Sequence, residues 1–70
     1  MIKLKLLNLG YDYDTENGRF YKETSKAKVE IDIYVCEIVY SLEMDSNTIN
    51  GEISYEEFDE AMGLIEEILN

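Results

Sequence analysis

The run from Lys28 to Leu42 most constrains the fold, because its apolar and β-branched residues alternate with polar ones. Alternation with a period of two is typical of a strand that buries one face. The apolar positions are first Val29, Ile31, Ile33 and Val35, and then Cys36, Ile38, Tyr40 and Leu42. We expect one long strand over about residues 28–42, with a β-bulge near residues 34–37 where the phase shifts. A strand covered on both faces, or a strand followed by a helix, would produce the same pattern.

A β-hairpin is expected before this strand, over about residues 2–23. The segment Ile2–Leu6 alternates apolar and basic residues, which favours a half-buried strand. Residues 11–18 form a polar turn that ends in Asn17-Gly18, a pair suited to the positive φ of hairpin loops. We expect a second strand over about residues 19–23 to pair with the first. Residues 24–27 then form a short connection to the long strand.

The C-terminal segment predicts a helix over about residues 55–69. A second polar turn at residues 45–51 precedes it, and Ser54 with Glu57 forms a capping box at its start. The apolar residues at helical spacing, which we expect to face the sheet, are Tyr55, Phe58, Ala61, Met62, Ile65, Ile68 and Leu69. The sequence therefore predicts a single α+β domain of two layers in the order β-β-β-α, with one C-terminal helix on a small three-stranded antiparallel sheet.

The charges are distributed unevenly along the chain. Six basic and sixteen acidic residues give a net charge of −10, and all the basic residues lie in the first 28 positions. The stretch from Val29 to Asn70 holds twelve acids and no base. A field of one sign repels DNA, RNA and anionic membranes, and it attracts basic surfaces, including those that hold phosphate. We therefore expect a basic protein surface as the partner, with no direct binding to nucleic acid or membrane.

Two groups of residues are candidates for contact with such a partner. The first is the polar face of the predicted helix, where carboxylates three and four positions apart lie about 5–6 Å from each other. It consists of Glu56, Glu57, Asp59, Glu60, Glu66 and Glu67. The second is a turn that interleaves acids with tyrosine, a residue enriched at interfaces, and it consists of Tyr11, Asp12, Tyr13, Asp14 and Glu16. The alternatives are a solvated acidic face, and tyrosines that pack over the end of the sheet.

The sequence offers little for catalysis or metal binding. The chain has no His, and no feature predicts a buried carboxylate pair. Residues 45–58 resemble the calcium loop of EF-hand proteins in their second half, but Ser46 stands where the first ligand belongs, five residues before Gly51. We expect no enzyme activity, no cofactor and no metal site. Calcium binding is the weakest of the alternatives.

Cys36 is the only cysteine, and its apolar neighbours predict a buried, reduced thiol. A single cysteine fits a reducing compartment. We expect no secretory leader, because no charged, apolar, small-residue pattern opens the sequence, and no apolar run comes near the length that spans a bilayer. We expect a complete, soluble protein of the cytoplasm.

In overall character the chain resembles the short acidic inhibitors encoded by phages, such as anti-CRISPR proteins and other DNA mimics. The likeness rests on the 70-residue length, the small β-plus-α layout, and the base-free stretch from Val29 to Asn70 with its acidic helix. It implies binding to the DNA-contacting groove of a Cas nuclease or a similar enzyme, in the host cytoplasm if the chain is phage-encoded. The alternative is a structural or regulatory interaction module, such as a homodimer, for which a marginal core and an edge-prone hairpin are the motives.

Overall fold

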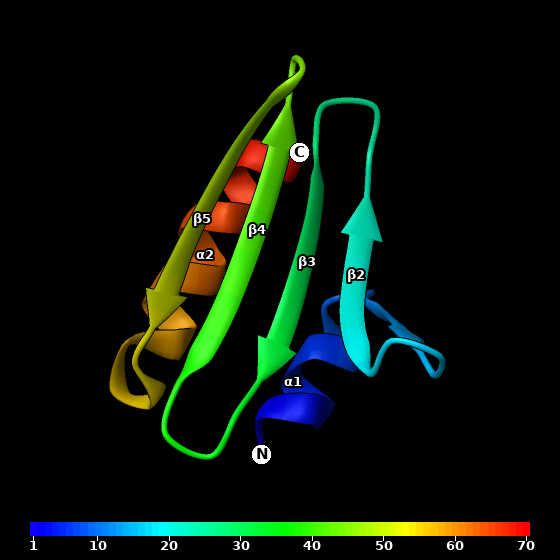
Figure 1. Cartoon of the computed structure of the whole chain (residues 1–70). Helices are drawn as coiled ribbons and strands as arrows, with labels where there is room; N and C mark the ends of the chain where they lie inside the picture. Colours follow the sequence, from blue (N-terminus) through cyan, green and yellow to red (C-terminus); the bar gives the residue numbers. More distant parts are fainter.

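The computed structural model describes residues 1–70 and contains a five-stranded antiparallel sheet with two helices (Figure 1). The elements in chain order are α1 (Ile2–Asn8), β1 (Asp12–Asp14), β2 (Arg19–Glu23), β3 (Lys28–Ile33), β4 (Ile38–Met44), β5 (Asn47–Ile53), the 3-10 turn η1 (Tyr55–Glu57) and α2 (Phe58–Leu69). The strands follow one another in the sheet in the order β1-β2-β3-β4-β5, each antiparallel to the next. The prediction of three strands and one helix is therefore wrong.

The first correction concerns Ile2–Leu6, which belongs to helix α1 and not to a strand. The five residues alternate, but Ile2 and Leu6 are also four positions apart, which places them on one face of a helix. Leu6 is fully buried and Ile2 packs against the core. A short apolar run satisfies both periods, so the pattern alone does not distinguish them.

The second correction concerns the predicted long strand, which is a hairpin of β3 and β4. The chain reverses at residues 34–37, where the Tyr34 N–H donates to the Glu37 carbonyl at 2.9 Å. The phase shift therefore marks a turn and not a β-bulge. Val35 is 95% exposed, and Cys36 is also exposed because it lies in this turn. The prediction of a buried thiol is wrong for that reason.

The third correction concerns the two predicted polar turns, because strands occupy parts of both. Only Asp45 and Ser46 form the loop between β4 and β5, and both have positive φ, at 51° and 68°. Two such residues form the tight loop that suits a twisted hairpin, so pairing continues from Met44 and Asn47 outward. Strand β1 likewise occupies residues 12–14, and it replaces Ile2–Leu6 as the partner of β2.

The C-terminal helix is confirmed and Ser54 caps its start, but the capping box is only half formed, because the Glu57 carboxylate accepts from the Ser54 hydroxyl and not from its backbone N–H. The Glu57 N–H donates to Ser54 Oγ at 3.3 Å, and that hydroxyl donates to Glu57 Oε1 at 2.8 Å. Its last turn is held by Thr24, whose hydroxyl donates to the Leu69 carbonyl at 2.6 Å and so satisfies one of the free helix-end acceptors. Of the seven residues predicted to face the sheet, Tyr55 and Ile68 are instead exposed.

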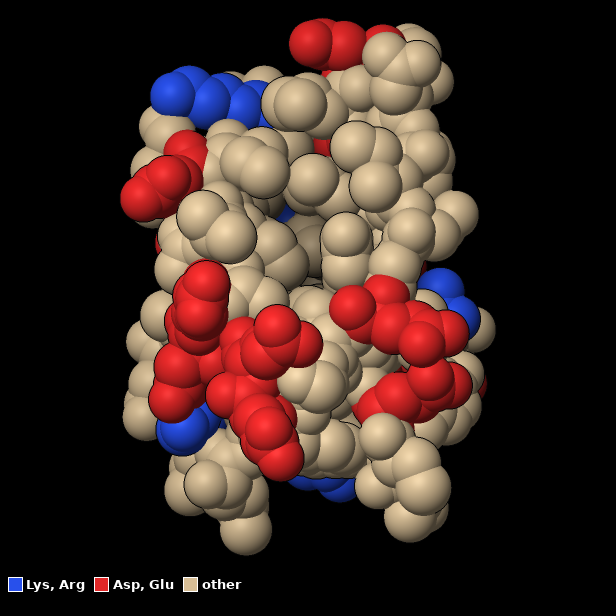
Figure 2. Space-filling view, turned by 90° about the vertical axis from the view of Figure 1, so that its left-hand side faces the viewer, with Lys and Arg blue, Asp and Glu red and all other residues tan.

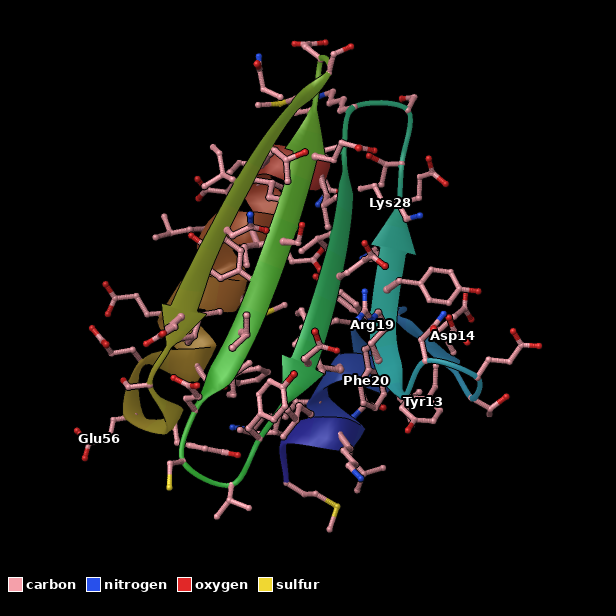
Figure 3. All side chains as sticks on the ribbon, in the orientation of Figure 1. Tyr13, Asp14, Arg19, Phe20, Lys28 and Glu56 are labelled. Atoms are coloured by element: carbon pink, nitrogen blue, oxygen red, sulfur yellow. The ribbon has the colours of Figure 1, made fainter.

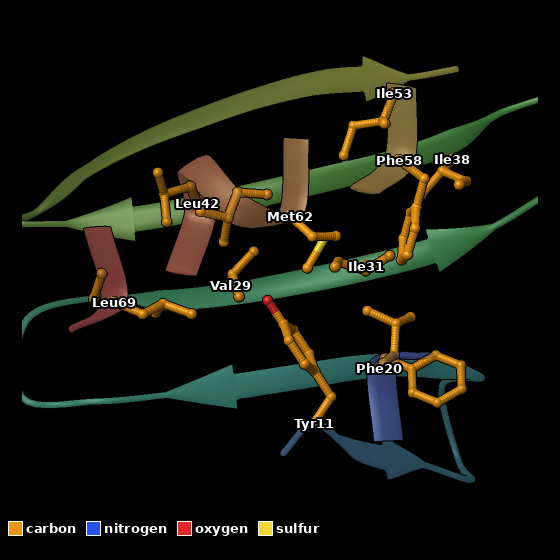
Figure 4. Packing of buried hydrophobic residues seen from close by; sticks show 13 residues of the cluster. Tyr11, Phe20, Val29, Ile31, Ile38, Leu42, Ile53, Phe58, Met62 and Leu69 are labelled. Atoms are coloured by element: carbon orange, nitrogen blue, oxygen red, sulfur yellow. The ribbon is translucent and has the colours of Figure 1, made fainter. Parts of the chain in front are cut away.

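The helices and the inner face of the sheet enclose one core (Figure 4). It consists of Leu6, Tyr11, Phe20, Ala27, Val29, Ile31, Ile38, Leu42, Ile53, Phe58, Met62, Ile65 and Leu69. The other face of the sheet is polar, with Tyr21, Glu30, Ser41 and Asn50 side by side across four strands. Neither helix has the length and apolar character needed to cross a membrane.

Candidate partner-binding surface

The acidic residues of α2 are divided between the two flanks of the helix. On the flank that faces α1, Lys5 Nζ lies 2.9 Å from Asp59 Oδ1. Farther along the same flank, Lys22 Nζ lies 3.0 Å from Glu66 Oε2 and also donates to the Leu9 carbonyl at 2.6 Å. Residues three and four apart repeat on one side of a helix, so Asp59 and Glu66 fall together. Basic residues from the first third of the chain thus neutralise this flank.

The remaining predicted residues of the helix face have no basic partner. Glu56, Glu57, Glu60 and Glu67 are all exposed, and none of them takes part in an ion pair. Glu57 and Glu60 lie on the flank that faces β5, where they line a groove. Both belong to the first turns of the helical segment, where negative charge is favoured by the helix dipole.

Two further carboxylates lie on the sheet side: Glu52 lines the same groove, and Glu37 is next to Glu52. Repulsion from Glu52 raises the pKa of Glu37 above its usual value, with smaller contributions from desolvation and from a hydrogen bond between the two side chains. The pairing of Ile38 with Ile53 brings the two acids together, although they are far apart in sequence. Sequence reasoning missed this pair because only the β4–β5 register, which was not predicted, connects them.

An apolar groove separates the helix carboxylates from Glu52. It has a volume of about 320 Å³. Its lining residues are Tyr40, Glu52, Ile53, Glu57, Glu60, Ala61, Leu64, Ile65 and Ile68. Figure 2 looks onto this side of the molecule and shows two groups of acidic side chains with uncharged surface between them. We call Glu52, Glu57 and Glu60, which line the groove, together with Glu37 beside Glu52, the groove carboxylates.

Gly51 gives the groove part of its shape. It pairs with Tyr40 across the β4–β5 ladder, and the tyrosine ring lies over the space where a side chain would stand. A Cβ built at Gly51 would be 2.7 Å from Tyr40 Cε1, which is closer than side-chain atoms pack. An aromatic ring that covers a cross-strand glycine restores packing that the glycine lacks. Tyr40 thereby becomes part of the groove wall.

The polar face of the sheet carries carboxylates that are already paired. Arg19 Nη1 lies 3.5 Å from Glu30 Oε2, and Arg19 Nε lies 3.3 Å from Asp32 Oδ1. With Asp59 and Glu66, four of the twelve acids from Val29 to Asn70 are in ion pairs, which leaves eight without a base. The groove carboxylates are four of those eight.

The tyrosine- and aspartate-rich turn lies on the other side of the molecule. Figure 3 shows Tyr13 and Asp14 on one side and Glu56 on the other. Tyr11 is only 3% exposed and offers no contact area, whereas Tyr13 packs on Phe20 with ring centroids 4.8 Å apart and is half exposed. The two groups predicted from the sequence are therefore not brought together.

Asp14 has a structural role within that turn. Its carboxylate accepts from the Asn17 side chain at 2.7 Å and from the backbone N–H groups of Glu16 and Asn17 at 2.9 and 3.2 Å. These bonds, led by the one from the Asn17 side chain, lower the pKa of Asp14. Asp12 and Glu16 remain exposed, without an ion pair.

Comparisons with protein-family models, with curated proteins and with solved structures found no match. The geometry of this chain is thus the basis for assigning a role to its residues.

The arrangement suits recognition of cations on a partner. No group of three or more His, Cys, Asp or Glu side chains is placed to hold a metal ion. The segment that resembles a calcium loop is extended as β5 over residues 47–53, so its oxygens are spread along a strand. Carboxylates beside an apolar groove can instead contact Lys or Arg side chains, whose aliphatic stems cover apolar surface while the charged ends reach the acids.

Proposed function

We propose that this protein is a non-catalytic binding protein that places the groove carboxylates against a basic surface of a nucleic-acid-binding protein. The observation that supports this proposal is the grouping of Glu52, Glu57 and Glu60 around one groove, with Glu37 beside Glu52, all without a basic partner. Holding like charges together is unfavourable, as the raised pKa of Glu37 indicates. A cationic partner would relieve that repulsion on binding.

The partner class follows from charge. A surface that normally holds nucleic-acid phosphates is rich in Lys and Arg, and it would attract a protein of net charge −10. The protein would then occupy the site and exclude nucleic acid. A phage-encoded inhibitor of the anti-CRISPR type, acting on a Cas nuclease or a similar enzyme, would work in this way.

The test is capture of basic proteins from bacterial lysate by the immobilised protein, followed by elution with duplex DNA. We expect the captured nucleic-acid-binding protein to be released by DNA and by raised salt, because both compete for the same cations. Capture that resists both treatments would refute the proposal.

A matched pair of variants separates the groove from the overall charge. The test variant carries Glu52→Gln, Glu57→Gln and Glu60→Gln, and it should lose capture. The control variant carries Glu23→Gln, Glu43→Gln and Asp45→Asn, three exposed acids without ion pairs and away from the groove, and it should keep most of the capture. Equal loss in both variants would mean that net charge alone matters.

A further inference from the structure

Strand β5 is an open edge of the sheet. It runs for seven residues, pairs only with β4, and has a continuous register without a bulge. Natural edge strands are commonly blocked by Pro, Lys, bulges or short length. The opposite edge strand, β1, has only three residues. Strand β5, whose sequence is Asn-Thr-Ile-Asn-Gly-Glu-Ile, has no Pro, Lys or bulge, and its one charged residue is Glu52 near its end.

The backbone of β5 presents a row of groups that can pair with another strand. In a hairpin with a two-residue loop, the two residues that flank the loop form a hydrogen-bonded backbone pair. Non-hydrogen-bonded and hydrogen-bonded pairs then alternate along the two strands. Asn47 is next to the loop, so the residues that point their N–H and C=O groups outward are Thr48, Asn50 and Glu52. All three are exposed, and no turn, loop or cap hydrogen bond uses their backbone groups.

The groove lies beside this edge, on the inner side of the sheet. A strand added to β5 would stand about 4.8 Å away and would point alternate side chains to the two faces. Those on the inner side would meet the exposed apolar residues of the groove region. Leu64 is 58% exposed, Ile68 is 37% exposed, and Ile49 of β5 itself is 55% exposed. Large apolar side chains at every second position would cover them.

The groove carboxylates define the other half of the recognition. Glu52 alternates with the inward-facing Gly51 and Ile53, so its side chain leaves the strand toward the outer face, close to Glu37. Because β5 is the edge strand, Glu52 also borders the groove. Outward-facing residues of an added strand would therefore lie next to two carboxylates. A Lys or Arg at those positions would pair with both. A second copy of this chain is disfavoured as the occupant, because it would bring a further net charge of −10 to this acidic edge.

We infer that β5 and its groove bind an extended segment of the partner in which Lys or Arg alternates with large apolar residues, and that the segment adds to the sheet as a sixth strand. This inference rests on the proposed function, because it identifies how the basic partner is held. Main-chain hydrogen bonds would provide affinity, and the alternating side chains would provide selectivity, as in other cases of strand addition. A segment of about seven residues matches the length of β5.

The test uses three synthetic peptides built from four Lys and three Ile, with both ends blocked. One alternates Lys and Ile, one has the isoleucines in a block, and one alternates but is N-methylated at every residue, so that neither of its edges has an N–H to donate to β5. We expect calorimetric affinity for the alternating peptide to exceed the affinity for each of the others by tenfold or more. We also expect it to slow amide hydrogen exchange at Thr48, Asn50 and Glu52.

Protein variants provide a second measurement. Asn50→Pro removes an outward N–H without removing a bond to β4, because Pro is tolerated where the N–H faces solvent. This variant should bind the alternating peptide with an affinity at least tenfold lower than that of the wild type. Leu64→Ser changes only the exposed wall of the groove and leaves β5 intact, so it should also weaken binding. It keeps the inference testable if the proline variant does not fold. Leu7→Ser, at an exposed position of α1 away from the groove, is the matched control and should bind normally.

Each contrary outcome is distinct. If all three peptides bind equally and release with salt, strand addition is overturned and the acidic-surface proposal stands. If the alternating peptide does not bind although lysate capture succeeds, strand addition is again overturned. A dimer in sedimentation whose formation protects Thr48, Asn50 and Glu52 without peptide would show that a second copy occupies the edge, and it would overturn the inference too.

Discussion

The buried hydroxyl of Tyr11 allows a sharp test of the packing. The side chain is 3% exposed and belongs to the core, yet its hydroxyl has no hydrogen-bond partner. A buried unpaired polar group costs about 1–3 kcal/mol, whereas an apolar group of the same shape costs little. Tyr11→Phe keeps the ring and removes the hydroxyl. We expect the free energy of unfolding to rise by about 1 kcal/mol, which raises Tm by roughly 4–8 °C in a domain of this size.

The assay is urea unfolding monitored by circular dichroism. The comparison requires that the wild type and the variant have the same dependence of unfolding free energy on urea concentration. Tyr13→Phe is the control, because Tyr13 is 46% exposed and its hydroxyl lies near the surface. Its effect should stay within about 0.5 kcal/mol.

The dependence of stability on alkaline pH is a second test of the Tyr11 hydroxyl. Burial, followed by the charge of Glu66, raises the pKa of Tyr11 above the ordinary tyrosine value of 10.0. Below about pH 10 the residue is protonated in both folded and unfolded chains and contributes no pH dependence. As pH rises from there toward the folded-state pKa, only the unfolded chain loses the proton. Stability then falls by up to about 1.4 kcal/mol per pH unit from this residue.

The Phe variant lacks this ionisation, so its advantage over the wild type should be constant near pH 8 and should grow above about pH 10. The two proteins differ only at this residue, so the pH dependence of the difference reports on Tyr11 alone. A Phe variant less stable than the wild type, or an advantage that does not change with pH, would mean that the hydroxyl is bonded or solvated in the folded state.

Three further predictions test the corrected fold and the groove. Ile31→Ala should lower the free energy of unfolding by about 2–5 kcal/mol, whereas Val35→Ala should change it by less than about 0.5 kcal/mol; similar losses in urea unfolding would contradict a turn at residues 34–37. Gly63→Ala should raise the free energy of unfolding by about 0.5–1 kcal/mol, because the residue is in mid-helix and a Cβ there meets no atom within 4 Å. A lower free energy of unfolding would mean that the helix is crowded at this position. Glu52→Gln should lower the pKa of Glu37, measured by NMR titration, toward its usual value. The raised pKa of Glu37 means that the wild type loses stability as pH rises and this carboxyl ionises beside Glu52. The Glu52→Gln variant should therefore be more stable than the wild type at neutral pH and equally stable in acid. A variant that is less stable at neutral pH would argue against repulsion.

Local chemistry was sufficient to predict the C-terminal helix. The Ser54–Glu57 cap acts within one turn, and the four core residues of α2 repeat at helical spacing. The candidates Glu57 and Glu60 follow directly, since a helix start determines which side chains share a flank. The strand character of Lys28–Ile33 and the short connection at residues 24–27 were predicted for the same reason: their signals extend over a few neighbouring residues.

Other features depend on contacts between distant segments. Ile2–Leu6 satisfies two periodicities, and its place against the core, with Lys5 on Asp59, makes it a helix. Glu37 and Glu52 meet only because the chain reverses at Asp45 and Ser46 and sets β5 beside β4. Strand order and helix placement likewise determine which carboxylates form ion pairs and which have no basic partner. Composition counts the charges along the chain, but ion pairing falls off over a few ångströms in space, and only the folded chain sets those distances.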